Sequence, residues 1–318
     1  MKYYGGIDLG GTNTKIGLLD TNANLIFSTS IKTEAIKGFE DTVDRICNAF
    51  KEEVRKNNIN YDDIIAIGAG IPGPALDKRV CVGFANLPWP NDLKMADLIE
   101  EKLNKPCFID NDVNVITLGE NFAGAAKGYK DILCIAIGTG IGAGIISGGK
   151  IISGKKGAAG EIGHLVLVPN GMLCGCGHNG CFEAYASATG IERIANSELV
   201  VNRTSSLHEL KKVRNIEAKD VFDAAKNGDI LANQIVDKEA DYLALGISHG
   251  LNLVNPSVVV LGGGVALAGD FLLDKVKKIL PQYALSATLD GLEIKGATLG
   301  NDAGIYGAAY LAMTELGE

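Results

Sequence analysis

Hydrophobic residues near the start of the chain fall in short runs separated by polar turns, which is the pattern of buried strands. The first run ends at Asp8 and is followed by a glycine turn at residues 9–13, a second strand at 14–20 and a third near 25–31. Residues 39–54 then place hydrophobic side chains at the spacing of an amphipathic helix. The chain is therefore expected to begin as a β-meander that leads into a helix.

Strands and helices continue to alternate along the chain, which predicts an α/β fold with a largely buried sheet. The opening pattern of strand, glycine loop and strand recurs at residues 133–147, so the two halves begin alike. The other predicted elements are strands at 64–69, 107–110, 258–261 and 293–297, helices at 93–103, 111–127, 229–252 and 302–314, and one helix opened by a capping box of Thr189 and Glu192.

Length and composition narrow the class of protein. The 318 residues are about twice the usual length of one domain, so two lobes are expected. The net charge of −8 comes without a basic run, which argues against nucleic acid or an anionic membrane as a partner. The uncharged run at 132–149 is long enough to span a membrane, but its glycine-rich centre favours strand, loop and strand. No signal peptide precedes the first strand, so a cytoplasmic location is expected.

Three glycine loops each follow a predicted strand, at residues 8–12, 138–142 and 262–264. Glycine lets backbone N–H groups approach phosphate oxygens, and the threonines of the first two loops add hydroxyl donors. Strands rather than helices follow these two loops, which argues against a dinucleotide-binding motif. Residues 149–156 narrowly miss a Walker A loop, because Lys156 replaces the required Ser or Thr.

Three of the seven cysteines, Cys174, Cys176 and Cys181, lie close together and follow His164. In a reducing compartment, this clustering favours a metal over disulfides. One imidazole and three thiolates suit tetrahedral Zn²⁺ and leave no vacant position, so such a site would be structural. His178 lies inside the cysteine loop and is a rival for the fourth ligand.

Polar residues of two further segments are candidates for binding a small molecule. Glu161 and Glu183 bracket the predicted metal ligands, and their carboxylates can accept hydrogen bonds from vicinal sugar hydroxyls. Residues 110–114 read Asp-Asn-Asp-Val-Asn at the end of a predicted strand. These side chains either cap the following helix or project into a cleft.

The paired strand–loop–strand phosphate grips and the third glycine loop resemble, from end to end of the chain, the duplicated nucleotide clamp of actin, Hsp70 and sugar kinases. Residues 160–164 with the cysteine cluster resemble the signature of the ROK family. The resemblance implies a two-lobed actin-like ATPase fold (a duplicated ribonuclease H-like fold) of the sugar kinase type with a structural zinc loop. We expect a smaller lobe at 1–113, a larger lobe with the zinc loop at 114–301, and a helix at about 302–318 that packs back on the first lobe.

For the nucleotide, the resemblance implies ATP with Mg²⁺, held through water by Asp8, while the glycine loops meet the phosphates and the adenosine. The residues expected to bind it are Asp8, Gly10, Gly11, Thr12, Asn13, Lys15, Gly138, Thr139, Gly140, Gly263 and Gly264. In the family, the histidine equivalent to His164 binds the metal, which places His164 ahead of His178 as the ligand.

For the acceptor, the resemblance makes Asn111 a sugar-binding residue and Asp112 the general base that takes the proton of the hydroxyl. Asp110 is a competitor by composition but is expected to point away from Asp112. The lone Trp89 suits sugar stacking and a core position equally. The residues expected to bind the sugar are Gly73, Asn86, Asn111, Asp112, Glu161, His164 and Glu183.

The cysteine spacing followed by Glu183 and Ala184 looks most like bacterial ROK glucokinases. The implied reaction is ATP-dependent phosphorylation of a hexose at its 6-hydroxyl, glucose to glucose 6-phosphate, in a homodimer or larger homo-oligomer. Kinases of N-acetylmannosamine, fructose or allose share nearly all these residues and are the alternatives. A sugar-sensing ROK repressor would need an N-terminal helix-turn-helix, for which no room is expected before Asp8. An actin-type ATPase is disfavoured by the zinc cluster together with the acceptor residues.

Overall fold

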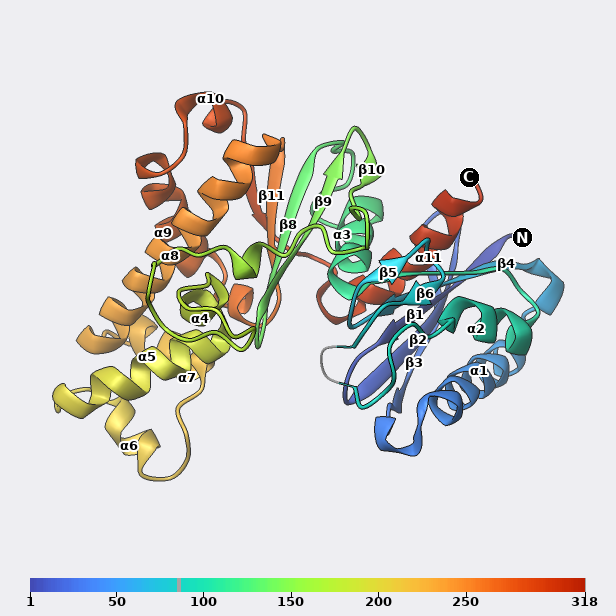
Figure 1. Cartoon of the computed structure of the whole chain (residues 1–318), viewed down its shortest axis with the longest axis horizontal. Helices are drawn as coiled ribbons and strands as arrows, with labels where there is room; N and C mark the ends of the chain where they lie inside the picture. The colour runs from blue at the N-terminus through green and yellow to red at the C-terminus, as the bar shows by residue number, and fades with distance from the viewer. Residues whose placement is uncertain (85–86, 318) are drawn as a thin grey trace.

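The computed structural model describes residues 1–84 and 87–317 and contains two five-stranded sheets (Figure 1). The first sheet has the order β3-β2-β1-β4-β7. In it, β2 is antiparallel to both β1 and β3, while β4 is parallel to both β1 and β7. Its strands are β1 (Tyr3–Leu9), β2 (Asn13–Asp20), β3 (Leu25–Lys32), β4 (Ile64–Ile71) and β7 (Cys107–Asn111).

The second sheet repeats this topology in the order β10-β9-β8-β11-β12. Again a three-stranded antiparallel meander is extended by two parallel strands. Its strands are β8 (Ile132–Ile137), β9 (Ile141–Ser147), β10 (Lys150–Ile151), β11 (Val258–Gly262) and β12 (Glu293–Gly296). The repeat is the duplicated arrangement that the two similar glycine loops predicted.

Two helices lie between the sheets, α3 (Asp112–Phe122) and α11 (Ala303–Glu315), and pack against each other. Ile305 and Ala309 of α11 pack on Tyr4 of the first sheet, whereas Ala308 shares a core with Val260 of the second. The C-terminal helix thus lies against β1 and β4. The helix expected at about 302–318 is observed as α11 at 303–315, while the division into lobes at 1–113 and 114–301 stays a prediction.

The outer faces of both sheets are also covered by helices, which completes two separate hydrophobic cores. On the first sheet these helices are α1 (Phe39–Lys56) and α2 (Met95–Leu103). The helices of the second lobe are α4 (Glu183–Ala186), α5 (Ala188–Val201), α6 (Leu207–Lys211), α7 (Ala218–Lys226), α8 (Ile230–Val254), α9 (Asp270–Ile279) and α10 (Ser286–Leu289). Among the described residues, no helix has the length and hydropathy needed to cross a membrane.

One predicted helix start is wrong. The residue that caps α5 is Ser187, whose Oγ accepts a hydrogen bond from the Gly190 N–H at 3.1 Å. Thr189 lies inside the first turn instead, and its hydroxyl donates to the Thr139 carbonyl at 2.9 Å. The capping box of Thr189 and Glu192 therefore does not form, because a serine two residues earlier supplies the cap.

A short hairpin was not predicted, because its two strands have only two residues each. It consists of β5 (Ala75–Leu76) and β6 (Val80–Cys81) and packs beside β7. The polar segment between α5 and α8, which carries α6 and α7, was also left without predicted elements.

Candidate active site

A cavity of about 560 Å³ opens between the lobes, lined by loops of both. The first lobe contributes the turn after β4 and the end of β7, and the second contributes the β8–β9 loop and the segment around Glu161. Six of the seven residues expected to bind a sugar line it, namely Gly73, Asn111, Asp112, Glu161, His164 and Glu183. The seventh, Asn86, lies outside the described residues.

Asn111 and Asp112 stand where β7 ends and α3 begins. The Asn111 side chain caps α3, because its Oδ1 accepts from the N–H groups of Val113 at 2.9 Å and Asn114 at 3.3 Å. Its Nδ2 also donates to the Gly73 carbonyl at 3.4 Å, so the cap is linked to the turn after β4. Asn111 therefore caps the helix and lines the cavity at the same time, and the two interpretations of this segment are compatible.

Asp112 contributes one of the carboxylates that line this cavity. Burial raises its pKa to about 6, and the negative charge of Asp8 adds to the rise, while a hydrogen bond from the Val113 N–H at 2.9 Å opposes it. A carboxylate with this pKa is still mostly ionised at neutral pH and is a stronger proton acceptor than an ordinary aspartate. The position can therefore perform general base chemistry on a hydroxyl.

A second cavity, of about 320 Å³, adjoins the first, because Ile116 and Ala136 line both. Asp8, Lys15, Gly263 and Gly264 line it, together with the start of α11. Burial raises the pKa of Asp8, and the positive charge of Lys15 opposes that rise. The Lys15 ammonium donates to the Asn301 carbonyl, which ties β2 to the turn before α11.

The remaining residues expected to bind a nucleotide are distributed around these cavities. Gly138 and Gly140 line the first cavity, and Thr139 lines a neighbouring one beside the cysteine cluster. Gly10, Gly11, Thr12 and Asn13 line none of these three cavities and form a turn, exposed from Gly11 to Asn13, that joins β1 to β2. Buried Thr33 supports this turn by donating from its hydroxyl to the Gly10 carbonyl at 2.6 Å.

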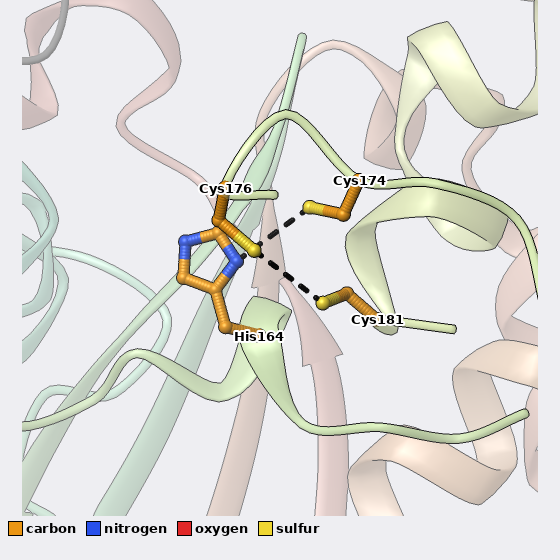
Figure 2. Close-up of side chains that lie close together, drawn as sticks. All are labelled: His164, Cys174, Cys176 and Cys181. Atoms are coloured by element: carbon orange, nitrogen blue, oxygen red, sulfur yellow. Dashed lines mark hydrogen bonds between the residues drawn. The ribbon is translucent and has the colours of Figure 1, made fainter. Parts of the chain in front are cut away.

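The predicted metal ligands come together in space. One ligand atom from each of His164, Cys174, Cys176 and Cys181 lies within 4.8 Å of the other three (Figure 2). His164 Nδ1 lies 3.8 Å from Cys174 Sγ, and its Nε2 faces Glu161 at 3.9 Å. One ring nitrogen thus points at the thiols while the other points towards the cavity. Three thiols and one imidazole suit a tetrahedral metal ion in type and number.

His178, the rival ligand, is not part of that group in the described structure. Its Nδ1 lies 3.5 Å from Cys176 Sγ, on the exposed side of the loop. The geometry therefore favours His164, which the sequence also placed first.

Glu183 connects the cysteine cluster to the second glycine loop. Its Oε2 accepts a hydrogen bond from the Ile141 N–H at 3.1 Å, and Cys174 Sγ lies 3.4 Å from its Oε1. A Cβ at position 140 would collide with this carboxylate, which explains the glycine there. The segment around the cysteines thus supports the glycine loop directly.

The match to a family model is decisive for the identity of the fold. The model described as the ROK family matches residues 4–315. The chain belongs to the ROK family. Among its relatives, the glucokinase of Halalkalibacterium halodurans is 39% identical, over 99% of this chain and 96% of that protein. The xylose repressor of Caldicellulosiruptor bescii is 26% identical, over 98% of this chain and 78% of the repressor.

A solved structure agrees with this family assignment. The ROK family glucokinase from Streptomyces griseus, crystallised with glucose and AMPPNP, superposes with a TM-score of 0.81 at 32% identity, over 98% of this chain and 99% of that one. The predicted two-lobed actin-like ATPase fold of the sugar kinase type is thereby confirmed.

The structure of this ROK protein shows where Asp110 and Trp89 lie, which the sequence left open. Asp110 is buried and accepts hydrogen bonds from the Asn111 N–H at 2.7 Å and Asn114 Nδ2 at 3.0 Å, so it points into the lobe and not into the cavity. Trp89 is also buried, and its indole N–H donates to the Ala35 carbonyl at 2.9 Å. It packs edge-on against Phe84 and Phe39, which makes it a core residue.

Sequence reasoning missed Glu120 of this ROK protein, which lines the second cavity. Its buried carboxylate accepts hydrogen bonds from the N–H groups of Ala125 at 2.8 Å and of Thr298 and Leu299 at 2.9–3.1 Å. Glu120 thereby fixes the chain where it passes from β12 towards α11. The sequence around Glu120 gives no signal of this role, because Thr298 and Leu299 lie 178 and 179 residues away.

Proposed function

We propose that this ROK protein transfers the γ-phosphoryl group of ATP to the 6-hydroxyl of a hexose, with glucose as its substrate. The chain is an ATP-dependent hexose kinase, as its relatives indicate. The observation that carries the residue assignment is the junction of the two cavities at Ile116 and Ala136, with Asp112 on one side and Asp8 on the other. Donor and acceptor can meet there.

In the proposed reaction, Asp112 accepts the proton of the 6-hydroxyl as that oxygen attacks the γ-phosphorus. Proton transfer comes late in phosphoryl transfer, so a carboxylate whose pKa is about 6 is basic enough. Asn111 and Asp112 share one helix start, which fixes the direction of the base relative to the hydroxyl. Orientation of this kind supplies much of the rate in phosphoryl transfer.

The nucleotide is proposed to occupy the second cavity, with its phosphates towards the glycine loops and the adenosine near Gly263 and Gly264. Asp8 and Lys15 present one carboxylate and one ammonium at this cavity. A carboxylate beside phosphate oxygens suits Mg²⁺, which usually keeps several waters in its shell. When bound with ATP, Mg²⁺ would neutralise charge on the phosphate oxygens, and Asp8 would hold it through water.

The sugar is proposed to be held by Gly73, Asn111, Glu161, His164 and Glu183, with Asn86 as a further partner outside the described residues. Carboxylate oxygens, an amide and a ring N–H together satisfy both donors and acceptors of sugar hydroxyls. His164 can do so through Nε2, because its Nδ1 faces the thiols.

The group formed by His164, Cys174, Cys176 and Cys181 is proposed to bind a structural Zn²⁺. Three thiols and one imidazole complete a tetrahedral shell, so no position is left for catalysis. Binding of this kind can contribute about 10 kcal/mol or more to the local fold. The metal would stabilise the loop that carries Glu183 and, through Ile141, the second glycine loop.

A sugar panel tests the proposal and separates it from the alternatives. Purified protein is given MgATP with glucose, N-acetylmannosamine, fructose or allose, and ADP release is measured. Glucose should give the highest kcat/KM, and a higher value with another sugar would reassign the substrate. The family also contains repressors, and a protein that binds sugar without turnover would belong to that class. A homodimer or larger assembly, which the family resemblance implies, is part of the same proposal, and so is a cytoplasmic location.

A further inference from the structure

Lys78 occupies the turn of the hairpin formed by β5 and β6. Asp77 and Lys78 have φ angles of +50° and +57°, in the left-handed region that favours glycine. The Lys78 carbonyl accepts a hydrogen bond from the Ile109 N–H at 2.8 Å, so the turn is fixed to the edge of β7. These φ values suit a tight hairpin turn, which the Arg79 N–H closes by donating to the Leu76 carbonyl at 3.0 Å. The turn is therefore held at both ends, and the backbone from which the Lys78 side chain projects is fixed.

The Lys78 ammonium forms an ion pair with buried Asp110. It is the cation that pairs with Asp110 in the described part of the chain. The other two groups bound to this carboxylate are the Asn111 N–H and the Asn114 side-chain amide, both at the start of α3. Lys78 therefore compensates the charge of the residue that fixes the backbone of Asn111, directly before Asp112.

The same ammonium also reaches the second lobe, because Lys78 Nζ donates to Ser153 Oγ at 3.1 Å. Ser153 lies just after β10, in a segment that packs against the hairpin. At Gly157 of this segment, with φ of +71°, a Cβ would collide with the Ala75 backbone. Near the end of this segment, the Gly160 carbonyl accepts a hydrogen bond from the Ala143 N–H of β9 at 3.0 Å. Glu161 follows directly.

One ammonium group thus contacts both lobes beside the acceptor cavity. We propose that Lys78 is a positioning residue that holds the Asn111–Asp112 helix start of one lobe in register with the Ser153–Glu161 segment of the other. Lys78 does not line the cavity itself, so it acts through Asp110 and Ser153. This inference rests on the proposed roles of Asn111, Asp112 and Glu161.

Its first test separates the two contacts by substitution. Lys78→Met keeps the length of the side chain but removes its charge, Ser153→Ala removes only the contact to the second lobe, and Lys155→Met alters an exposed lysine two residues further along as a control. Lys78→Met should lower kcat and raise the glucose KM, each by about tenfold or more, because a small displacement of reacting groups is costly. The KM for ATP should stay within about twofold.

Ser153→Ala should raise the glucose KM about threefold with kcat unchanged, and Lys155→Met should change neither constant. The value of kcat is calculated per folded enzyme, and the folded fraction is taken from circular dichroism. A purely structural role would reduce the folded fraction and leave the ratio of the two KM values as it was. A glucose KM for Lys78→Met within twofold of the wild type would overturn the proposal.

A double variant keeps the test valid where Lys78→Met alone fails to fold with an unpaired buried carboxylate. Lys78→Met combined with Asp110→Asn removes both charges and should fold, because loss of a whole buried pair is tolerated better than loss of one partner. Its glucose KM should rise about tenfold or more above that of the wild type, because the contact of Lys78 with Ser153 is lost together with the ion pair. A glucose KM of the double variant within twofold of the wild type would overturn the proposal. Activity retained by Asp112→Asn would instead refute the proposed base, and the glucose KM of the Lys78 variants would still decide this inference.

Discussion

Asp8 and Asp112 lie close enough together for the negative charge of Asp8 to add to the effect of burial, which raises the pKa of Asp112 to about 6. The two carboxylates belong to different cavities, and these meet at Ile116 and Ala136. A Mg²⁺ ion or a proton beside Asp8 would reduce the repulsion between the two carboxylates and lower the pKa of Asp112. Occupancy of the second cavity can therefore change how basic Asp112 is.

The pH dependence of turnover follows from this pKa. Asp112 must be ionised to accept a proton, and its ionised fraction decreases as the pH falls through about 6. We expect kcat/KM for glucose, measured at saturating MgATP, to be level above pH 7 and to fall about tenfold for each pH unit below 6. A profile that stays level down to pH 5 would mean that the base has an ordinary aspartate pKa or that another group acts.

Substitution of the base should separate chemistry from binding. Asp112→Asn is expected to reduce kcat by about 10²–10⁴, the usual contribution of general base catalysis. Glucose affinity, measured by calorimetry without ATP, should stay within a few-fold, because the amide keeps the shape and most of the hydrogen bonding. Asp62→Asn, an exposed aspartate in the turn directly before β4, serves as the control and should leave both values unchanged. Turnover near the wild-type level in Asp112→Asn would remove Asp112 from the reaction.

Removal of one thiol tests the zinc proposal. Cys176→Ala should lose the zinc, because three ligands hold it far more weakly than four. The glucose KM should then rise before the ATP KM does, since Glu161 and Glu183 lie beside the ligands. Metal content by mass spectrometry and the two KM values are the measurements.

His178→Ala is the matched control for this experiment, because His178 lies 3.5 Å from Cys176 Sγ but outside the group of four. This variant should keep about one zinc per chain. Loss of zinc in His178→Ala would mean that His178 is the fourth ligand in place of His164. Absence of zinc from the wild-type protein would refute the site.

A buried acid in α8 limits stability at high pH. Glu239 is 2% exposed, and neither carboxylate oxygen has a hydrogen-bond partner among the described residues. Burial raises its pKa well above 4.5. The folded state therefore prefers the protonated acid, and this contribution is complete below the unfolded-state pKa and is lost as the pH rises through the folded-state pKa.

Glu239→Leu should remove this dependence and raise the free energy of unfolding at pH 8 by about 1–3 kcal/mol, the usual cost of a buried unpaired polar group. Urea unfolding of the variant and the wild type at pH 5.5 and pH 8 measures the effect. Glu209→Gln, in an exposed ion pair with Lys212, should change little at either pH. An equal difference between the Glu239 variant and the wild type at both pH values would contradict the assignment.

Local patterns explain which features the sequence could predict. The strands and the three glycine loops are marked by short hydrophobic runs and glycine, which depend on neighbours in sequence. His164 and the cysteines are marked by the rarity of such a cluster. The hairpin that carries Lys78 has no such mark, because its strands are too short for periodicity and its partner Ser153 lies 75 residues away. The cap of α5 was misplaced for a related reason, since Ser187 and Thr189 are both acceptable caps and tertiary contacts decide between them.

The junction of the two cavities affects how much ATP is hydrolysed by water without phosphorylation of the sugar. Its common wall is formed by an isoleucine and an alanine, whose side chains offer no hydrogen bond to a stray water molecule. Water at this point would compete with the sugar for the phosphoryl group, and these two side chains give it no partner. In the proposed reaction, the amount of sugar phosphorylated per ATP consumed thus depends partly on two side chains that carry no charge and take no part in the chemistry.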